Sequence, residues 1–547
     1  MKKRLLAGLV CLALFAGCSR ADVTTAAKTG NSWTRHGVLR FAENQDARSL
    51  NPMLATSASV GDLSMFLFSY AVRYDDKGDP VPDALSEIPT LENGDVSRDG
   101  LTLKYKLRPN ILWHDGVPLT SKDLWFSWTC VMNRHNNVIT TDGYKDIASI
   151  DYSDPHVAVI HMKKIYTPFL QQIFGVNGNT VILPEHLLAK VNDEKGSFNN
   201  APYQSAPVGS GPFKFVSWQR GSTVRMEAFP GYFRGKPKLN EVIFSIMPDE
   251  NTMVTQLRTH EIDMEVRGSG VLWDQYRAIS DTVAIHPKAY VYDHIDFNLL
   301  HPPFDDVNVR RALATAINRK AILEKIYHGL GELAPADESP SIGKAYDPNV
   351  MRYPYDPAKA KAMLDADGWH VGADGVRVKN GMRLSFNFST QTESAIGLRI
   401  QEQVQRYWHD VGAEAAVKNA PTALFFDNTR IGILQGGHYD VASFAWTAAA
   451  DPDDSAIYSA DNLAPGGQNN LFWKDAVATK AMNDGLATVD FSKRKAAYSI
   501  VQQRLASEVP TIVLFFREAP IVYNSDLKGF TASPVISPFW NPWEYSI

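Results

Sequence analysis

Two kinds of hydrophobic pattern divide the chain. Residues 101–107, LTLKYKL, alternate apolar and polar side chains with period two, which predicts a half-buried strand. Residues 213–216 and 224–229 lie on either side of a Gly-bearing turn and predict a β-hairpin. In residues 309–323, VRRALATAINRKAIL, apolar side chains recur three and four positions apart, which predicts one amphipathic helix with a basic outer face.

Strands and helices alternate from residue 300 to 510. Helices are predicted at 355–369, which opens on Asp-Pro and stops at a Gly, and at 393–412. Strands are predicted at 384–390 and 439–446, where β-branched and aromatic residues gather. This alternation predicts an α/β lobe with a βαβ layout.

Length and charge narrow the class of protein. A chain of 547 residues exceeds what one compact core usually holds, so two or three subdomains are expected. The formal net charge is −5, and no run of Lys and Arg is interleaved with aromatic residues. We therefore expect no nucleic-acid partner.

The N-terminus predicts export. A basic start precedes a short apolar stretch, LLAGLVCLALFAG, as in a secretory signal. Residues 15–18, FAGC, resemble a bacterial lipoprotein box, in which Cys18 becomes the lipidated first residue of the mature chain. Phe15 departs from the usual leucine of that box, and residues 19–21 offer an ordinary cleavage site. A secreted protein without lipid therefore stays an alternative.

The signal segment, residues 1–18, is followed by a small and polar stretch. Residues 19–36 lack apolar periodicity, which predicts a flexible tether between the lipid and the folded body. No later stretch is long and apolar enough to predict a membrane span. We expect a periplasmic protein, attached to the membrane through its lipid.

Catalytic and metal-binding motifs are missing from the sequence. It contains no Gly-x-Ser-x-Gly, His-Glu-x-x-His, Cys-x-x-Cys, Walker A or Gly-x-Gly-x-x-Gly pattern. After processing only Cys130 stays free, and its apolar setting predicts a packing role. His114-Asp115 and the acids Asp451, Asp453 and Asp454 could do acid/base work or hold a metal. For the acids, a helix cap and a ligand contact stay open beside catalysis and metal binding. We expect no catalysis and no cofactor.

One segment carries a specific resemblance. LTLKYKLRPNILWHDGVPLTSKDLWFSW, at 101–128, resembles the strand, Arg-bearing turn, DG-x-P-LT loop and helix of extracytoplasmic solute-binding proteins of family 5. Further segments agree with that family, in the family's order: VGSGPFKFVSW with AFPGYF, FDDVNVRRALATAINRKAI, YDPAKAKAMLDADGW, and FFDNTRIGILQGGHYDVASFAWTA. The chain is similar to the oligopeptide- and dipeptide-binding receptors of ABC importers.

The resemblance implies a fold. Such proteins have an α/β, two-lobed periplasmic binding protein fold (type II, cluster C), with an extra subdomain inserted in the first lobe. The boundaries implied here are 37–76, 205–291 and 515–547 for the first lobe, 77–204 for the insertion, and 292–514 for the second lobe. The resemblance also implies that the chain crosses between lobes near 295–297 and 514–516.

The resemblance also implies a site. In peptide-binding relatives the strand end beside a Trp pairs with the extended peptide, and an acid three residues after that Trp holds the α-ammonium group. The matching residues here are Trp446, Thr447 and Ala448, and Ala449 stands where the acid is expected. Asp451 takes the acid's place only if the loop bends differently.

Other residues complete the expected site. Asn51 and Met53, after the first strand, are candidates by family position. The small run Ala448–Ala450 makes room for a ligand or for the opposite lobe, and a tight turn without function stays open.

Several functions follow from this resemblance. The leading expectation is capture of a solute by closing lobes, followed by docking of a monomer on an ABC permease and its ATPase. The solute is a peptide whose amine meets Asp451 or another acid, a peptide with a blocked or differently placed amine, or a non-peptide such as an oligosaccharide stacked on Trp446. A periplasmic hydrolase using His114 and the acids, and a sensory co-receptor, are the competing classes.

Overall fold

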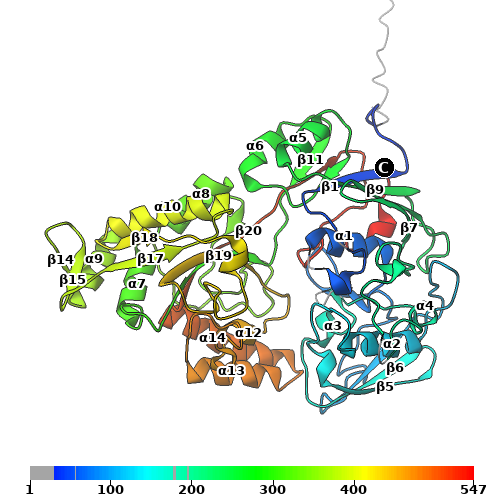
Figure 1. Cartoon of the computed structure of the whole chain (residues 1–547), viewed down its shortest axis with the longest axis horizontal. Helices are drawn as coiled ribbons and strands as arrows, with labels where there is room; N and C mark the ends of the chain where they lie inside the picture. Colours follow the sequence, from blue (N-terminus) through cyan, green and yellow to red (C-terminus); the bar gives the residue numbers. More distant parts are fainter. Residues whose placement is uncertain (1–29, 48, 56, 177–179, 194–195) are drawn as a thin grey trace, which may run out of the picture.

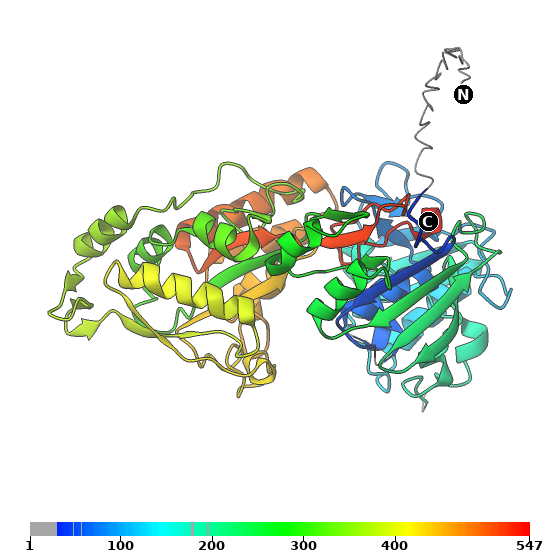
Figure 2. The ribbon, with the colours of Figure 1, turned by 90° about the horizontal axis from the view of Figure 1, so that it is seen from above.

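The computed structural model describes residues 30–547 except 48, 56, 177–179 and 194–195. Two lobes lie side by side, and each is built on its own β-sheet (Figures 1 and 2). The predicted signal segment 1–18, the lipidation residue Cys18 and the first part of the predicted tether lie outside the described residues. The two-lobed α/β fold expected from the sequence is confirmed.

The first lobe is built on a seven-stranded sheet. Its strand order is β11-β21-β10-β1-β9-β8-β7, with β1 parallel to β9 and β10. The predicted hairpin is confirmed as the antiparallel pair β7 and β8. The strands are β1 (Val38–Glu43), β7 (Phe213–Gln219), β8 (Thr223–Ala228), β9 (Glu241–Ile246), β10 (Met264–Glu265), β11 (Thr282–Ile285) and β21 (Ile521–Asn524).

Helices cover this sheet and a smaller sheet adjoins it. The helices are α1 (Ala58–Leu67), α5 (Glu250–Arg258) and α6 (Trp273–Arg277). Below them in Figure 1, a three-stranded antiparallel sheet, β4-β6-β5, packs against α2. Thr120 caps α2 together with Asp123. The bounds here are β2 (Val72–Tyr74), β3 (Pro80–Pro82), β4 (Thr102–Lys106), β5 (Ile147–Asp154), β6 (Val157–Met162), α2 (Ser121–Met132), α3 (Phe169–Gln172) and α4 (Glu185–Leu188).

The second lobe is built on a six-stranded sheet. Its order is β13-β20-β12-β19-β17-β18. β17, α10 and β18 form the predicted parallel βαβ unit, whereas β12 is antiparallel to both β19 and β20. The strands are β12 (Val291–Phe297), β13 (Gly331–Glu332), β17 (Ser385–Ser389), β18 (Glu414–Val417), β19 (Val441–Thr447) and β20 (Thr511–Arg517).

Helices surround the second sheet on both sides. Figure 1 shows α8 and α10 above it and α13 and α14 below it. The helices are α7 (Val307–Thr315), α8 (Arg319–Tyr327), α9 (Pro357–Ala366), α10 (Ala395–His409), α11 (Thr422–Phe425), α12 (Ser455–Tyr458), α13 (Ala476–Leu486) and α14 (Phe491–Glu508). A small sheet, β14 (His370–Val371), β15 (Arg377–Lys379) and β16 (Met382–Arg383), lies at the far end of this lobe.

Two sequence expectations are corrected here. The single helix predicted over 309–323 is two helices, because the Asn318 side chain accepts a hydrogen bond from Ala321 N at 3.0 Å and starts α8. The residues expected to cross between lobes, 295–297 and 514–516, lie inside β12 and β20 of the second sheet. A run of hydrophobic residues predicts a strand that is buried on both faces of a sheet. It does not predict where the chain passes from one lobe to the other. The connections between the two sheets are 286–290 and 518–520.

The predicted tether is shorter than expected. Asn31 N donates to Asp526 Oδ2 at 2.6 Å, and the Trp33 ring stacks on His260 with centroids 4.2 Å apart. These residues are therefore held against the first lobe. The remaining lobe boundaries stay a prediction.

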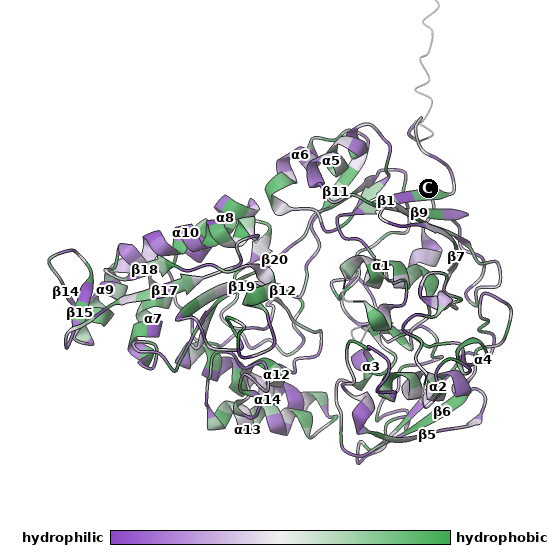
Figure 3. Cartoon of the chain, in the orientation of Figure 1, coloured by the Kyte–Doolittle hydropathy of each residue, from purple (hydrophilic) through white to green (hydrophobic). Residues whose placement is uncertain are grey.

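Each lobe has its own hydrophobic core. The first is centred on aromatic residues such as Phe41, and the second on the fully buried Trp408. Figure 3 shows hydrophobic residues along β12 and β19, in the middle of the second sheet. Cys130 is fully buried, and burial raises the pKa of its thiol well above its usual value, which fits a packing role. Among the residues described, no helix is both long enough and apolar enough to cross a membrane.

Candidate functional site

The strand β19 positions the predicted ligand contacts. It runs beside β12, with Trp446 opposite Tyr292 and Thr447 opposite Val291. Because side chains alternate along a strand, Trp446 and Thr447 point to opposite faces of the sheet. They therefore line two different pockets.

Trp446 lies over a small pocket within the second lobe, here called the Trp446 pocket. Its volume is about 20 Å³. Its walls come from β12, from β19, from α12 and from the chain after α12. The lining residues are Tyr292, His294, Asp296, Phe444, Trp446, Ile457, Tyr458, Gln468, Asn470 and Leu471.

Thr447 and Ala448 line a second pocket, here called the hinge pocket, between the two lobes. Its volume is about 110 Å³, and Arg267 and Ile521 of the first lobe also line it. Ala448 N donates to Tyr290 O at 2.7 Å, which fixes the strand end beside one of the two connections. The strand end thus lies between the lobes, and a ligand contact there stays a prediction.

Arg267 and Lys288 bring positive charge to the hinge pocket. The Arg267 guanidinium donates to both carboxylate oxygens of Asp62, at 3.0 and 2.9 Å. Burial and the neighbouring Asp62 raise the pKa of Glu43 well above its usual value, and Glu43 Oε1 has no hydrogen-bond partner among the described residues. Arg267 thus forms hydrogen bonds with buried Asp62 and also acts electrostatically on buried Glu43.

A third and larger cavity lies between the segments that flank β5 and β6 and the second lobe. Its volume is about 610 Å³. Lys145, Lys164 and Tyr166 come from one side, and Asp453 and Asn483 from the other. A solute of several heavy atoms fits this space.

Asp451 does not offer a free carboxylate to a ligand. Arg494 Nη1 and Nη2 donate to its two oxygens at 2.7 and 2.6 Å. Burial raises the pKa values of the neighbouring Asp453 and Asp454. Because its carboxylate is already paired, the contact with Arg494 argues against the expectation that Asp451 replaces the missing acid at Ala449.

The run of small residues brings the lobes together. Ala448 and Ala450 pack against the hydrophobic core of the first lobe. This packing fits close approach of the opposite lobe, and a ligand contact at this run stays a prediction.

Asn51 and Met53 are buried in the first lobe. Asn51 is 0% exposed, and its Oδ1 accepts a hydrogen bond from Met53 N at 3.1 Å. Met53 is 2% exposed and belongs to the hydrophobic core. Both residues hold a short turn in place, and neither is one of the residues that line the pockets described here.

Both ring nitrogens of His114 form hydrogen bonds with backbone atoms, so the side chain is not positioned for acid/base work. Its Nδ1 accepts from Gly209 N at 3.1 Å, and its Nε2 donates to Gly211 O at 3.1 Å. Burial lowers the pKa of His114 to about 4, so the ring is neutral at pH 7. In the part of the chain that the structure describes, no group of three His, Cys, Asp or Glu side chains could hold a metal ion.

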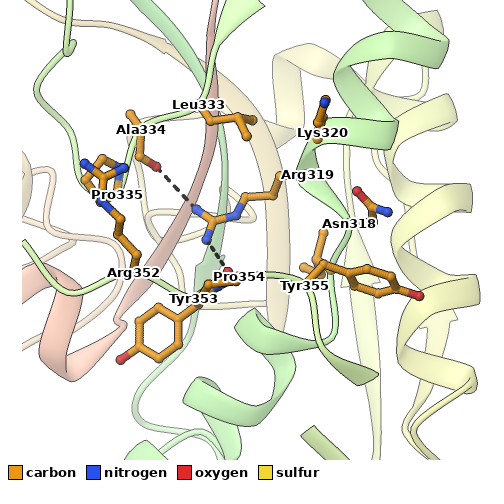
Figure 4. Close-up of a pocket in the computed structure, with 11 residues that line it drawn as sticks. Asn318, Arg319, Lys320, Leu333, Ala334, Pro335, Arg352, Tyr353, Pro354 and Tyr355 are labelled. Carbon is orange, nitrogen blue, oxygen red and sulfur yellow. Dashed lines mark hydrogen bonds between the residues drawn. The ribbon is translucent and has the colours of Figure 1, made fainter. Parts of the chain in front are cut away.

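A separate cationic pocket lies within the second lobe. Figure 4 shows the Arg319 guanidinium between Ala334 and Tyr353, with Lys320 and Arg352 on opposite sides. Arg319 donates to three carbonyl oxygens: Ala334 at 3.3 Å, and Val513 and Tyr353 at 2.9 Å. Burial and the charge of Arg352 lower its pKa to about 10. Arg319 therefore ties α8 to β20 and to the chain that precedes α9.

The sequence interpretation missed the polar residues of β12. Tyr292, His294 and Asp296 share one face of this strand and line the Trp446 pocket. The signal was present, because Asp293, His294 and Asp296 lie close together inside a strand that is almost wholly buried.

Comparisons with known proteins agree with this geometry. The family model for bacterial extracellular solute-binding proteins, family 5, matches residues 49–468. The oligopeptide-binding protein AppA of Bacillus subtilis is 25% identical, over 98% of this chain and 97% of that protein.

Solved structures show the same likeness. That AppA, in complex with a nonapeptide, has a TM-score of 0.73 at 25% identity, covering 93% of this chain and 98% of that one. NikZ from Campylobacter jejuni, in complex with Ni(L-His), has a TM-score of 0.77 at 25% identity, covering 94% of this chain and 100% of that one. Two lobes with a strand end between them, and a family model that spans most of the sequence, place the chain among the bacterial extracellular solute-binding proteins of family 5.

Proposed function

We propose that this protein is the substrate-binding component of an ABC importer, and that it captures a peptide between its lobes. The family match carries this proposal, and the position of β19 supports it. A ligand in the gap touches Thr447 and Ala448 from one lobe and Arg267 from the other. Binding then favours the closed form, which a permease recognises.

The mature protein works at the cell envelope, as a monomer without a cofactor. The residues of the lipoprotein box support lipid attachment at Cys18 and a periplasmic location. The partners are an ABC permease and its ATPase, and the membrane is reached through the lipid. No catalytic step is proposed, because His114 is committed to the backbone of Gly209 and Gly211.

Peptide capture is tested on protein purified from its own cells. The protein is denatured, and the small molecules it releases are identified by mass spectrometry. We expect a mixture of peptides. Titration of the emptied protein with those peptides, followed by small-angle scattering, is expected to show compaction on binding. Release of sugars or of metal chelates alone contradicts the peptide assignment, and cleavage of a bound peptide contradicts a role without catalysis.

A further inference from the structure

The cationic pocket of the second lobe lacks a negative partner. This pocket, here called the Arg319 pocket, is lined by Arg319, Lys320 and Arg352, and no Asp or Glu is among its described lining residues. Within the described part of the chain, neither arginine forms an ion pair with a carboxylate. Lys320 Nζ lies 3.8 Å from Glu324 Oε1, where both side chains are exposed. Positive charge that is partly removed from water needs a counter-ion, so the pocket calls for an anion.

Arg319 has hydrogen-bond donors to spare. A guanidinium carries five N–H donors. The Nη1 and Nη2 atoms of Arg319 donate to the carbonyl oxygens of Ala334, Val513 and Tyr353. Its Nε atom has no hydrogen-bond partner among the residues described, and the side chain lines the pocket. The carbonyl groups therefore hold the guanidinium in place, and N–H donors remain for a ligand.

The positive charges around the pocket repel one another. Figure 4 shows Lys320 and Arg352 on opposite sides of the Arg319 guanidinium. Burial and the charge of Arg352 lower the pKa of Arg319 to about 10. The helix α8 also begins at Arg319, and the N-terminus of a helix carries a partial positive charge. An anion among these groups relieves the repulsion and is attracted by each of them.

The placement of the cations favours a phosphate group over a carboxylate. The two oxygens of a carboxylate lie in one plane and pair with one arginine side-on. A phosphate monoester has three terminal oxygens and close to two negative charges, so one group can face Arg319, Lys320 and Arg352 together.

The size and the remaining walls of the pocket suit an organic phosphate. Its volume is about 200 Å³, far more than one water molecule needs, which leaves room beside the phosphate. The rest of the wall is largely apolar or aromatic. These lining residues are Ile317, Leu333, Ala334, Pro335, Tyr353, Pro354 and Tyr355.

The Arg319 pocket is separate from the gap between the lobes. It shares no lining residue with the hinge pocket, the Trp446 pocket or the larger cavity. Lys320, Arg352 and Tyr355 are exposed on the surface of the second lobe. A ligand in this pocket therefore leaves the gap free for the transported solute.

We propose that the Arg319 pocket binds a phosphate monoester, at a second site distinct from the one that captures the transported solute. This inference goes beyond the proposed function and does not depend on which solute is transported. The phosphate belongs to a soluble organic phosphate or to a lipid headgroup with a terminal phosphate, since both present the same chemistry. Arg319 is the fixed donor, and Lys320 and Arg352 reach the phosphate from opposite sides.

Calorimetry on the full mature chain tests the site in solution. The probes are glycerol 3-phosphate, the diester glycerophosphocholine, and glycerate, which is a carboxylate of similar size. Glycerol 3-phosphate is expected to bind at least about tenfold tighter than the other two, because only it brings three terminal oxygens and close to two negative charges. Equally tight binding of glycerate would point to a carboxylate partner, such as an acidic protein segment, and overturns the phosphate assignment.

A double variant tests which residues hold the phosphate. Lys320→Gln with Arg352→Gln is expected to weaken glycerol 3-phosphate about tenfold or more, because each removed charge is a hydrogen-bond donor to an ionised group. Arg319 is kept, since its bonds to three carbonyl oxygens support the fold. Arg98→Gln with Lys104→Gln, exposed before and within β4, is the control of equal charge and is expected to bind as the wild type does. An equal loss in both double variants shows a general charge effect and overturns the site.

Vesicles separate the two sources of the phosphate. The Cys18→Ser chain, which cannot carry a lipid at that residue, is sedimented with phosphatidylcholine vesicles with and without added phosphatidic acid. Binding that requires phosphatidic acid and is lost in the Lys320→Gln, Arg352→Gln variant identifies a lipid headgroup as the source. Binding of glycerol 3-phosphate without binding to vesicles identifies a soluble phosphate. If neither probe binds, the phosphate site is refuted, and peptide capture still stands or falls on its own test.

Discussion

Arg494 and Asp451 form a bidentate ion pair that fixes the loop after β19. The two nitrogen–oxygen distances are 2.7 and 2.6 Å, and the side chains are 6% and 10% exposed. The pair joins α14 to the loop that begins at the end of β19. This ion pair holds the loop that follows the end of β19 against α14.

Replacing Asp451 by Asn is expected to cost stability and to change ligand affinity little. The substitution leaves the buried Arg494 without a counter-ion, and breaking a buried ion pair costs about 3–5 kcal/mol. Urea unfolding measures the loss, and titration with a co-purified ligand measures affinity. Asp410→Asn, at an exposed position at the end of α10, serves as control. A large loss of affinity with unchanged stability would restore Asp451 as a ligand contact.

Gly209→Ala is expected to destabilise the first lobe. A Cβ atom at Gly209 would lie 1.8 Å from the carbonyl oxygen of Leu67, so the backbone must move. Overpacking of this kind costs about 1–3 kcal/mol. The midpoint of thermal unfolding measures the effect. Gly466→Ala is the control, because the atom nearest to its added Cβ is 3.8 Å away, and a melting curve equally affected in both variants would refute the steric explanation.

Glu265 is expected to make stability fall as pH rises. Burial raises its pKa to about 8, and the Tyr276 hydroxyl donates to Glu265 Oε1 at 2.6 Å. Between pH 4.5 and about 8, the folded state therefore keeps the Glu265 carboxyl protonated. In the unfolded chain the pKa of this carboxyl is 4.5, so it is ionised over the same range. The stability from this proton is fully present below pH 4.5 and is lost as pH rises through about 8, by up to about 1.4 kcal/mol per pH unit.

Thermal melts from pH 5 to 8.5 check this pH dependence, with the range set by the raised pKa of Glu265. Glu265→Gln stays neutral throughout, so its melting temperature is expected to fall less steeply with pH. Glu92→Gln, at an exposed position, is expected to behave as the wild type. Parallel curves for Glu265→Gln and the wild type would show that this carboxyl is already ionised.

Lys344 and Asp79 are expected to favour the closed form weakly. Lys344 Nζ, from the second lobe, lies 2.8 Å from Asp79 Oδ1, in the turn between β2 and β3. Both side chains are partly exposed, so the pair contributes at most about 1 kcal/mol, and Lys344→Gln is expected to weaken ligand binding about fivefold at most. Titrations at low and high salt measure this, and the difference should shrink in high salt. An equal effect in Lys359→Gln, which is exposed in α9, would rule out a specific contact.

The local pattern of the sequence was enough for most elements and for the family. Period-two alternation predicted β4 and the hairpin of β7 and β8, and the Asp-Pro pair predicted the start of α9. These elements depend on neighbours in sequence, such as caps and alternating faces, which a short window contains. The family's segments then implied two lobes and a ligand contact at the end of β19.

Other features were decided only by tertiary structure. Whether Asp451 is free depends on Arg494, which lies 43 residues later in the chain, and whether His294 and Asp296 meet Asn470 depends on how the chain after α12 folds over β12. A sequence states which groups can ionise or accept a hydrogen bond. It does not state which distant group reaches them, because burial and pairing are set by contacts between segments far apart in the chain.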